Sequence, residues 1–155
     1  MAIADDVIVR RGIDWGNIWG GKVADRDLRF ALYVTLGGLA LCLILYGVFS
    51  TMIWPIIALT FLFGFVGFAT VPPLQMDVLG RAAEAPTLAS AMNIAAFNLG
   101  NAVGAGAGGL VVEAEWGLEF IPYVSAIFAI LGIGVVYLNA PKSRARRMKA
   151  QHAAH

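Results

Sequence analysis

The stretch FALYVTLGGLALCLILYGVFS, residues 30–50, contains no charged residue, and it decides the solvent in which this chain folds. A helix needs about 20 mostly apolar residues to cross a bilayer. The charge-free gap that begins after Arg29 continues to Asp77 and is long enough for two such helices. Two later gaps, between residues 84 and 113 and between 119 and 142, accommodate one helix each. We therefore predict an all-α membrane protein with four transmembrane helices. The predicted spans are roughly residues 30–50, 53–73, 88–112 and 120–140.

The overall composition agrees with a lipid environment. Of the 155 residues, 59% are hydrophobic and only 14% are charged, whereas soluble domains carry about a quarter charged residues. A soluble helical protein would also show charge on one face of each helix every turn or two. That pattern is missing from the four apolar stretches, so the composition argues against a soluble domain.

The charges outside the spans predict the orientation. Four spans put both termini and the connection between the second and third spans on one side, and that side then holds all 11 Lys and Arg residues. The opposite loops are STM, with no charge, and EAEWGLE, with three glutamates. By the positive-inside rule we expect a plasma (inner) membrane protein with both termini in the cytoplasm. This divides the chain into a cytoplasmic N-terminal segment (1–29), a four-helix transmembrane region (30–140) and a basic cytoplasmic tail (141–155).

The third span contains an unusual row of small residues within NIAAFNLGNAVGAGAGG, residues 93–109. Gly100, Gly104 and Gly108 fall on one helix face, and Ala96 extends the row by one turn. Helices in lipid associate through close backbone contact and polar contacts. We predict that this row packs against another helix.

The same span carries three asparagines beside the glycine row. Asn93, Asn98 and Asn101 lie within an arc of about 140°, and Gln75 follows the prolines at the end of the second span. An amide that faced lipid would be unsatisfied, so we expect these side chains to face protein or water. Three interpretations stay open: hydrogen bonds between helices, the lining of a substrate pathway, or a helix end close to water.

Two stretches resemble a known family. GNIWGGKVADR (16–26) and VPPLQMDVLGRAAEAPTLASAMNIAAFNLGNAVGAGAGG (71–109) resemble the C-terminal part of a major facilitator superfamily transporter, from the end of helix 8 to helix 12. The closest similarity is to the drug:proton antiporter branch, which includes sugar, purine and chloramphenicol exporters. The resemblance covers roughly residues 16–140 and implies a partial major facilitator fold.

The resemblance also implies a cytoplasmic gate motif just before the first span. The family pattern G-x-L-a-D-R-x-G-R-K is matched at Gly21, Ala24, Asp25, Arg26 and Arg29. It is not matched at three positions, which hold Val23, Leu28 and Phe30. In the family the Asp–Arg unit holds helices together on the cytoplasmic side and gates the conformational switch. By resemblance, Gly21, Asp25, Arg26 and Arg29 take this role here, although alone GGKVADR is equally typical of a turn with positive-inside charges.

The length departs from the family, whose members have about twelve helices in two halves that rock around a midplane site. This chain has no counterpart of the first half, of helix 7 or of most of helix 8, and the charged MAIADDVIVRRGID stands where helix 8 should run. We expect a truncated or partial gene product that does not transport alone. The resemblance implies a parent protein that exports a small molecule, coupled to protons, by alternating access. The expected partners are the lipid bilayer, that substrate and the missing transporter half.

Two other functions stay open. The chain could be a non-transporting membrane scaffold or assembly partner, or a small four-helix antiporter. The latter would need a carboxylate within the membrane, and the four predicted spans contain none.

An enzyme is not expected. The only histidines, His152 and His155, lie in the tail, and GAGAGG lacks the strand and lysine of a phosphate-binding loop. We predict no catalytic residues, no cofactor and no metal site. The basic tail is better explained by anionic lipid than by nucleic acid. The sequence does not indicate the substrate, the coupling ion or the oligomeric state.

Overall fold

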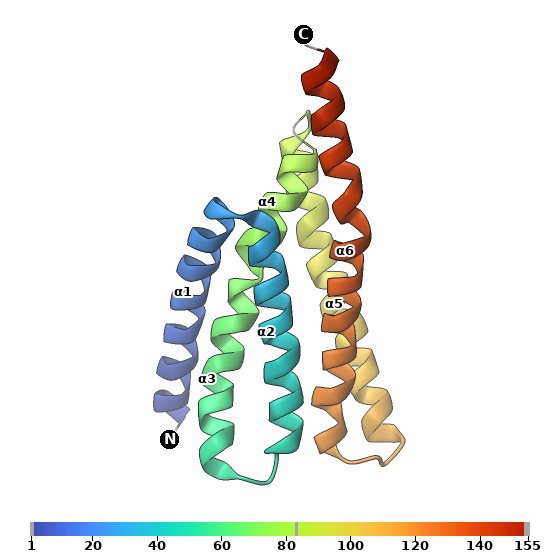
Figure 1. Cartoon of the computed structure of the whole chain (residues 1–155). Coiled ribbons are helices and arrows are strands. Elements are labelled where there is room, and N and C mark those ends of the chain that lie inside the picture. The colour runs from blue at the N-terminus through green and yellow to red at the C-terminus, as the bar shows by residue number, and fades with distance from the viewer. Residues whose placement is uncertain (1, 83, 154–155) are drawn as a thin grey trace.

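The computed structural model describes residues 2–82 and 84–153, and the side chains of residues 11–82 and 84–139. This part of the chain contains helices and no strand, and the long helices run side by side as a bundle (Figure 1). The helices are α1 (Ala2–Arg26), α2 (Leu28–Val48), α3 (Ile53–Ala69), α4 (Val71–Arg81), α5 (Pro86–Glu113), the short 3₁₀ helix η1 (Leu118–Phe120) and α6 (Ile121–Ala153).

The four predicted spans are confirmed. Four helical segments are long and apolar enough to cross a membrane: Leu28–Val48, Ile53–Arg81, Pro86–Glu113 and Leu118–Asn139. The predicted bounds of the first, third and last spans agree with these to within two residues, whereas the second segment extends eight residues further, to Arg81. The predicted basic tail continues α6 as helix up to Ala153, and its side chains lie outside the described residues.

The prolines of the second span interrupt its helix. Pro72 and Pro73 have no N–H to donate, so they deprive the carbonyls one turn earlier of their helical hydrogen bonds. α3 therefore ends at Ala69, and α4 begins after the single residue Thr70, whose hydroxyl donates to the Gly67 carbonyl at 2.6 Å. Beyond this point α4 leans across the bundle toward α5 and α6 (Figure 1).

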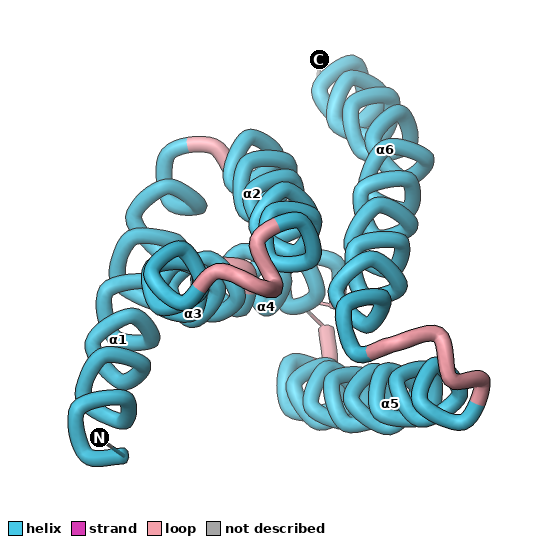
Figure 2. Tube along the Cα trace, turned by 90° about the horizontal axis from the view of Figure 1, so that it is seen from below, coloured by secondary structure: helices cyan, strands magenta, loops and turns pink. Residues whose placement is uncertain are grey.

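The N-terminal segment differs from the expectation that only its last turns belong to a helix. Residues 2–26 form one continuous helix, α1, which lies along α3 (Figures 1 and 2). α1 begins at the end of the bundle that holds the α2–α3 turn, whereas α6 ends at the opposite end (Figure 1). The expectation that both termini lie on one side of the membrane counts only the four apolar spans. It therefore holds only if α1 does not cross the membrane as well.

The contact between α1 and α3 is made by glycines. A Cβ on Gly12 would lie 3.0 Å from the Phe61 carbonyl oxygen. A Cβ on Gly16 or Gly20 would overlap the carbonyl oxygens of Phe65 and Ala69. Only glycine allows the two backbones to approach this closely, as small residues do between membrane helices in general.

α2 occupies the centre of the bundle and contacts both α3 and α6. Cys42 is buried against α3, with its sulfur 3.7 Å from the Leu59 carbonyl oxygen. The Tyr46 hydroxyl and the Thr60 hydroxyl are 3.2 Å apart. On the side of α6, Gly47 lies against the ring of Tyr123, which leaves no room for a Cβ.

Candidate functional site

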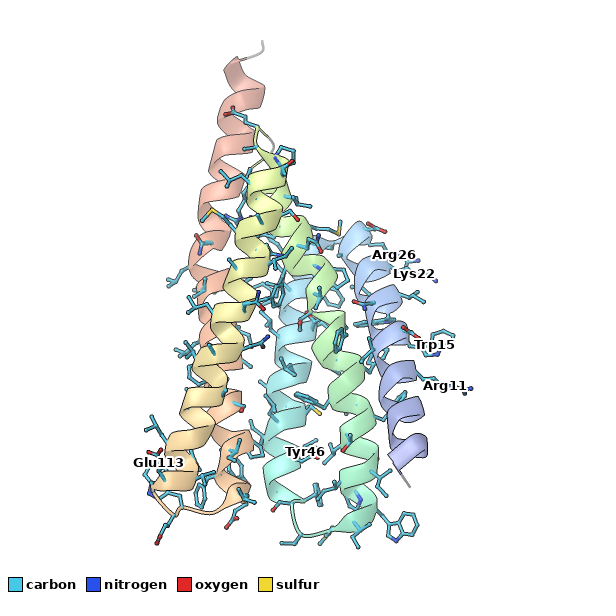
Figure 3. The ribbon with its side chains drawn as sticks, turned by 180° about the vertical axis from the view of Figure 1, so that it is seen from behind. Arg11, Trp15, Lys22, Arg26, Tyr46 and Glu113 are labelled. Atoms are coloured by element: carbon cyan, nitrogen blue, oxygen red, sulfur yellow. The ribbon has the colours of Figure 1, made fainter. Side chains whose placement is uncertain are left out.

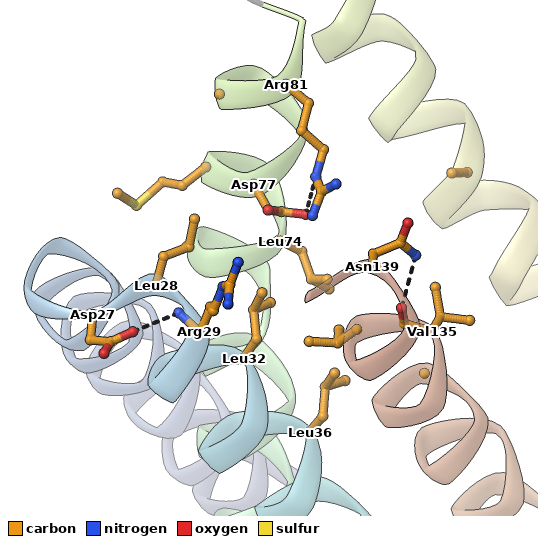
Figure 4. A pocket seen from close by; sticks show the side chains of 15 residues that line it. Asp27, Leu28, Arg29, Leu32, Leu36, Leu74, Asp77, Arg81, Val135 and Asn139 are labelled. Atoms are coloured by element: carbon orange, nitrogen blue, oxygen red, sulfur yellow. Dashed lines mark hydrogen bonds and ion pairs between the residues drawn. The ribbon is translucent and has the colours of Figure 1, made fainter. Parts of the chain in front are cut away.

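A pocket of about 1270 Å³ opens at the end of the bundle where α1 turns into α2 (Figure 4). It lies between α2, α4, α5 and α6. Its apolar wall includes Leu32, Leu36, Leu74, Val135 and Val136. Its polar side chains are Asp27, Arg29, Asp77, Arg81 and Asn139. The pocket thus combines an apolar interior with two acids, two arginines and an amide from three helices and the residue that joins α1 to α2.

Asp27 fixes the start of α2 beside this pocket. It lies between the two helices in an extended conformation, and its Oδ1 accepts hydrogen bonds from the backbone N–H of Arg29 at 2.9 Å and of Phe30 at 3.0 Å. Such an N-cap satisfies donors that a helix leaves free at its first turn. The cap therefore fixes the first turn of α2 and, with it, the position from which the Arg29 side chain extends. Figure 4 shows the Arg29 side chain pointing into the pocket toward α4.

α4 contributes an ion pair to the same pocket. Arg81 Nε lies 2.8 Å from Asp77 Oδ2, one helical turn away, with side chains that are 52% and 31% exposed. A pair this exposed contributes at most about 1 kcal/mol to stability. Its main consequence is to hold both charges on the face of α4 that lines the pocket. Across the pocket, Asn139 Nδ2 donates to the Val135 carbonyl at 2.8 Å.

The predicted gate motif is only partly brought to this pocket. Arg29 lines it. Asp25 and Arg26 lie in the last turn of α1 and are exposed, and a Cβ on Gly21 would lie 4.0 Å from Pro72. Asp25 and Arg26 therefore flank the pocket in sequence without lining it, and their gating role stays a prediction.

The predicted substrate-pathway residues lie outside the pocket. Gln75, Asn98 and Asn101 are exposed, and Asn93 is partly buried. Ala96 is the one residue of α5 that lines the pocket. The role of these four amides in a pathway also stays a prediction.

The glycine row on α5 has almost no neighbour in the described part of the chain. A Cβ on Gly100 or Gly104 would meet nothing within 4 Å, and one on Gly108 would meet only Ile121 Cγ2 at 3.9 Å. Ala96 is exposed as well. Only 6% of the apolar window of α5 is buried, against 39% of that of α2. The described residues therefore do not show the predicted close packing of this row, which stays a prediction.

Sequence reasoning missed four polar residues of the pocket: Asp27, Asp77, Arg81 and Asn139. The sequence contains a recognisable signal for Asp27 and for the Asp77–Arg81 pair. An aspartate directly before an apolar helical run is a preferred N-cap, and Asp77 and Arg81 have the i,i+4 spacing of a helical ion pair. No local signal distinguishes Asn139, which reaches the pocket only through the placement of α6. Within the described residues, no group of three or more His, Cys, Asp or Glu side chains is placed to hold a metal ion.

Comparison with known proteins identifies the family. The family model of the Major Facilitator Superfamily matches residues 15–155, which is most of the chain. The chain belongs to the major facilitator superfamily. Together with the four apolar helices, this makes it a multi-pass membrane protein, and it confirms the resemblance seen in the sequence.

Relatives in this superfamily are membrane transport proteins by name. The chain is 41% identical over 141 residues to the inner membrane transport protein YdhP of Escherichia coli (strain K12), covering 88% of this chain and 35% of the relative. It is 30% identical to the uncharacterized MFS-type transporter YfhI of Bacillus subtilis (strain 168), covering 76% and 30%. It is 34% identical to a probable sugar efflux transporter of Pasteurella multocida (strain Pm70), covering 68% and 26%. No solved structure matches the chain.

The alignments cover most of this chain but only a part of each relative. The chain spans about a third of the length of the curated relatives that it matches. Members of the major facilitator superfamily are generally not enzymes.

Proposed function

We propose that this chain forms the C-terminal part of a secondary transporter that exports a small molecule, coupled to protons, by alternating access, and that it does not transport alone. Two observations carry the proposal: the family model matches residues 15–155, and the alignment with YdhP covers only 35% of that relative. Alternating access requires two bodies that rock around a midplane site. A chain with about one third of the relatives' length supplies part of one of these bodies.

The exposed face of α5 supports a missing second body. This helix is the least buried of the four apolar segments, and it exposes both the amides of Asn98 and Asn101 and the glycines at 100 and 104. Polar side chains on a membrane helix face protein or a water-filled cavity rather than lipid. α5 is therefore the helix that we expect to border both the substrate route and the other half of the transporter.

The charged pocket supports a role in gating. Arg29 on α2 and the Asp77–Arg81 pair on α4 come from different helices and meet in one pocket. A movement of α4 relative to α2 would change the distances between these charges, and Coulomb interactions depend on such distances. We infer that the pocket, together with Asp25 and Arg26, forms the cytoplasmic gate. The basic residues near this end and in the predicted tail support the cytoplasmic orientation.

Co-expression tests the proposal. This chain is produced in a bacterial host that lacks its own exporters, either alone or with the N-terminal two thirds of YdhP as a separate polypeptide. Efflux of a panel of fluorescent or radiolabelled small molecules is followed with and without an uncoupler that abolishes the proton gradient. We expect no efflux from the chain alone, and uncoupler-sensitive efflux when both parts are present.

A matched variant separates assembly from transport. In the co-expressed pair, Asn101→Leu should abolish efflux of the transported compound while membrane insertion and co-purification of the two parts persist, because a pathway amide is lost. Efflux from this chain without any partner would contradict the proposal. Normal efflux with Asn101→Leu would remove Asn101 from the pathway.

A further inference from the structure

We draw no further inference here: the strongest candidate, the exposed face of α5 around Gly100 and Gly104, on the helix that ends at Glu113 (Figure 3), is a stripe of small residues, and nothing in the described part of the chain shows what covers it.

Discussion

Gly16→Ala is expected to separate α1 from α3 and to lower the free energy of unfolding in detergent by roughly 1–3 kcal/mol. The added Cβ would overlap the Phe65 carbonyl oxygen and approach the Ala69 nitrogen at 3.2 Å. These are backbone atoms, which cannot rotate away, so the helices must move apart along the whole contact. Unfolding of the purified chain, followed by circular dichroism or tryptophan fluorescence during denaturant titration, measures the change.

The matched control for this prediction lies on α5. Gly104 belongs to a row of glycines with the same four-residue spacing, and a Cβ there would meet nothing within 4 Å. Alanine is favoured over glycine in a helix by about 1 kcal/mol, so Gly104→Ala should leave the isolated chain unchanged or more stable. Equal losses from the two substitutions would contradict the assignment of α1 and α3 as the closely packed pair.

Gly47→Ala is expected to have an effect of similar size on the contact between α2 and α6, again roughly 1–3 kcal/mol of unfolding free energy. A Cβ at this position would lie 2.6–2.9 Å from the ring atoms of Tyr123. Here the neighbour is a side chain, so part of the strain can be relieved by removing the ring. The same denaturant titration applies.

A compensating change tests this contact specifically. Tyr123→Leu alone should destabilise the chain, since it removes the ring that packs against Gly47 and is near Phe120, 6.2 Å away between ring centroids. In the Gly47→Ala background it should cost less than it does alone, because contacting residues are not additive. Strictly additive losses would show that the ring and Gly47 do not restrict each other.

The four apolar helices could be predicted from the sequence because lipid imposes a simple requirement. A span needs a long run of residues without charge, and such runs are visible directly. The interruption at Pro72 and Pro73 was equally predictable, since proline lacks the N–H that a helix uses. Family membership agreed with the motifs at 16–26 and 71–109.

The choice between the two glycine rows could not be made from spacing. Gly12, Gly16 and Gly20 have the same periodicity as Gly100, Gly104 and Gly108, but the first row lies in a helix with charged residues, so hydropathy does not mark that helix as a span. The two rows differ in what they contact. The first row contacts α3, whereas most of the second row contacts nothing within the described residues. Periodicity predicts that a face can pack closely, and only the arrangement of the helices shows which partner is present.

The candidate site was predictable to a smaller degree. Arg29 was identified by its motif, whereas Asp77 and Arg81 lie 48 and 52 positions later and reach the same pocket through the bend before α4. The end of α6, with Asn139, completes the pocket from the far end of the sequence. Such a pocket depends on helix placement, and the resemblance to the family pointed to the adjacent Asp25 and Arg26 instead.

Labelling of single cysteines tests the central claim, that the four apolar helices cross the membrane in alternating directions. Thr51, Glu84 and Glu115 are exposed positions in the three connections between these helices, and each is replaced by cysteine in a Cys42→Ala chain. A maleimide that cannot cross membranes is then added to intact cells. The account predicts labelling at positions 51 and 115 from outside, and labelling at position 84 only after the cells are permeabilised. Labelling at all three positions from the same side would contradict it.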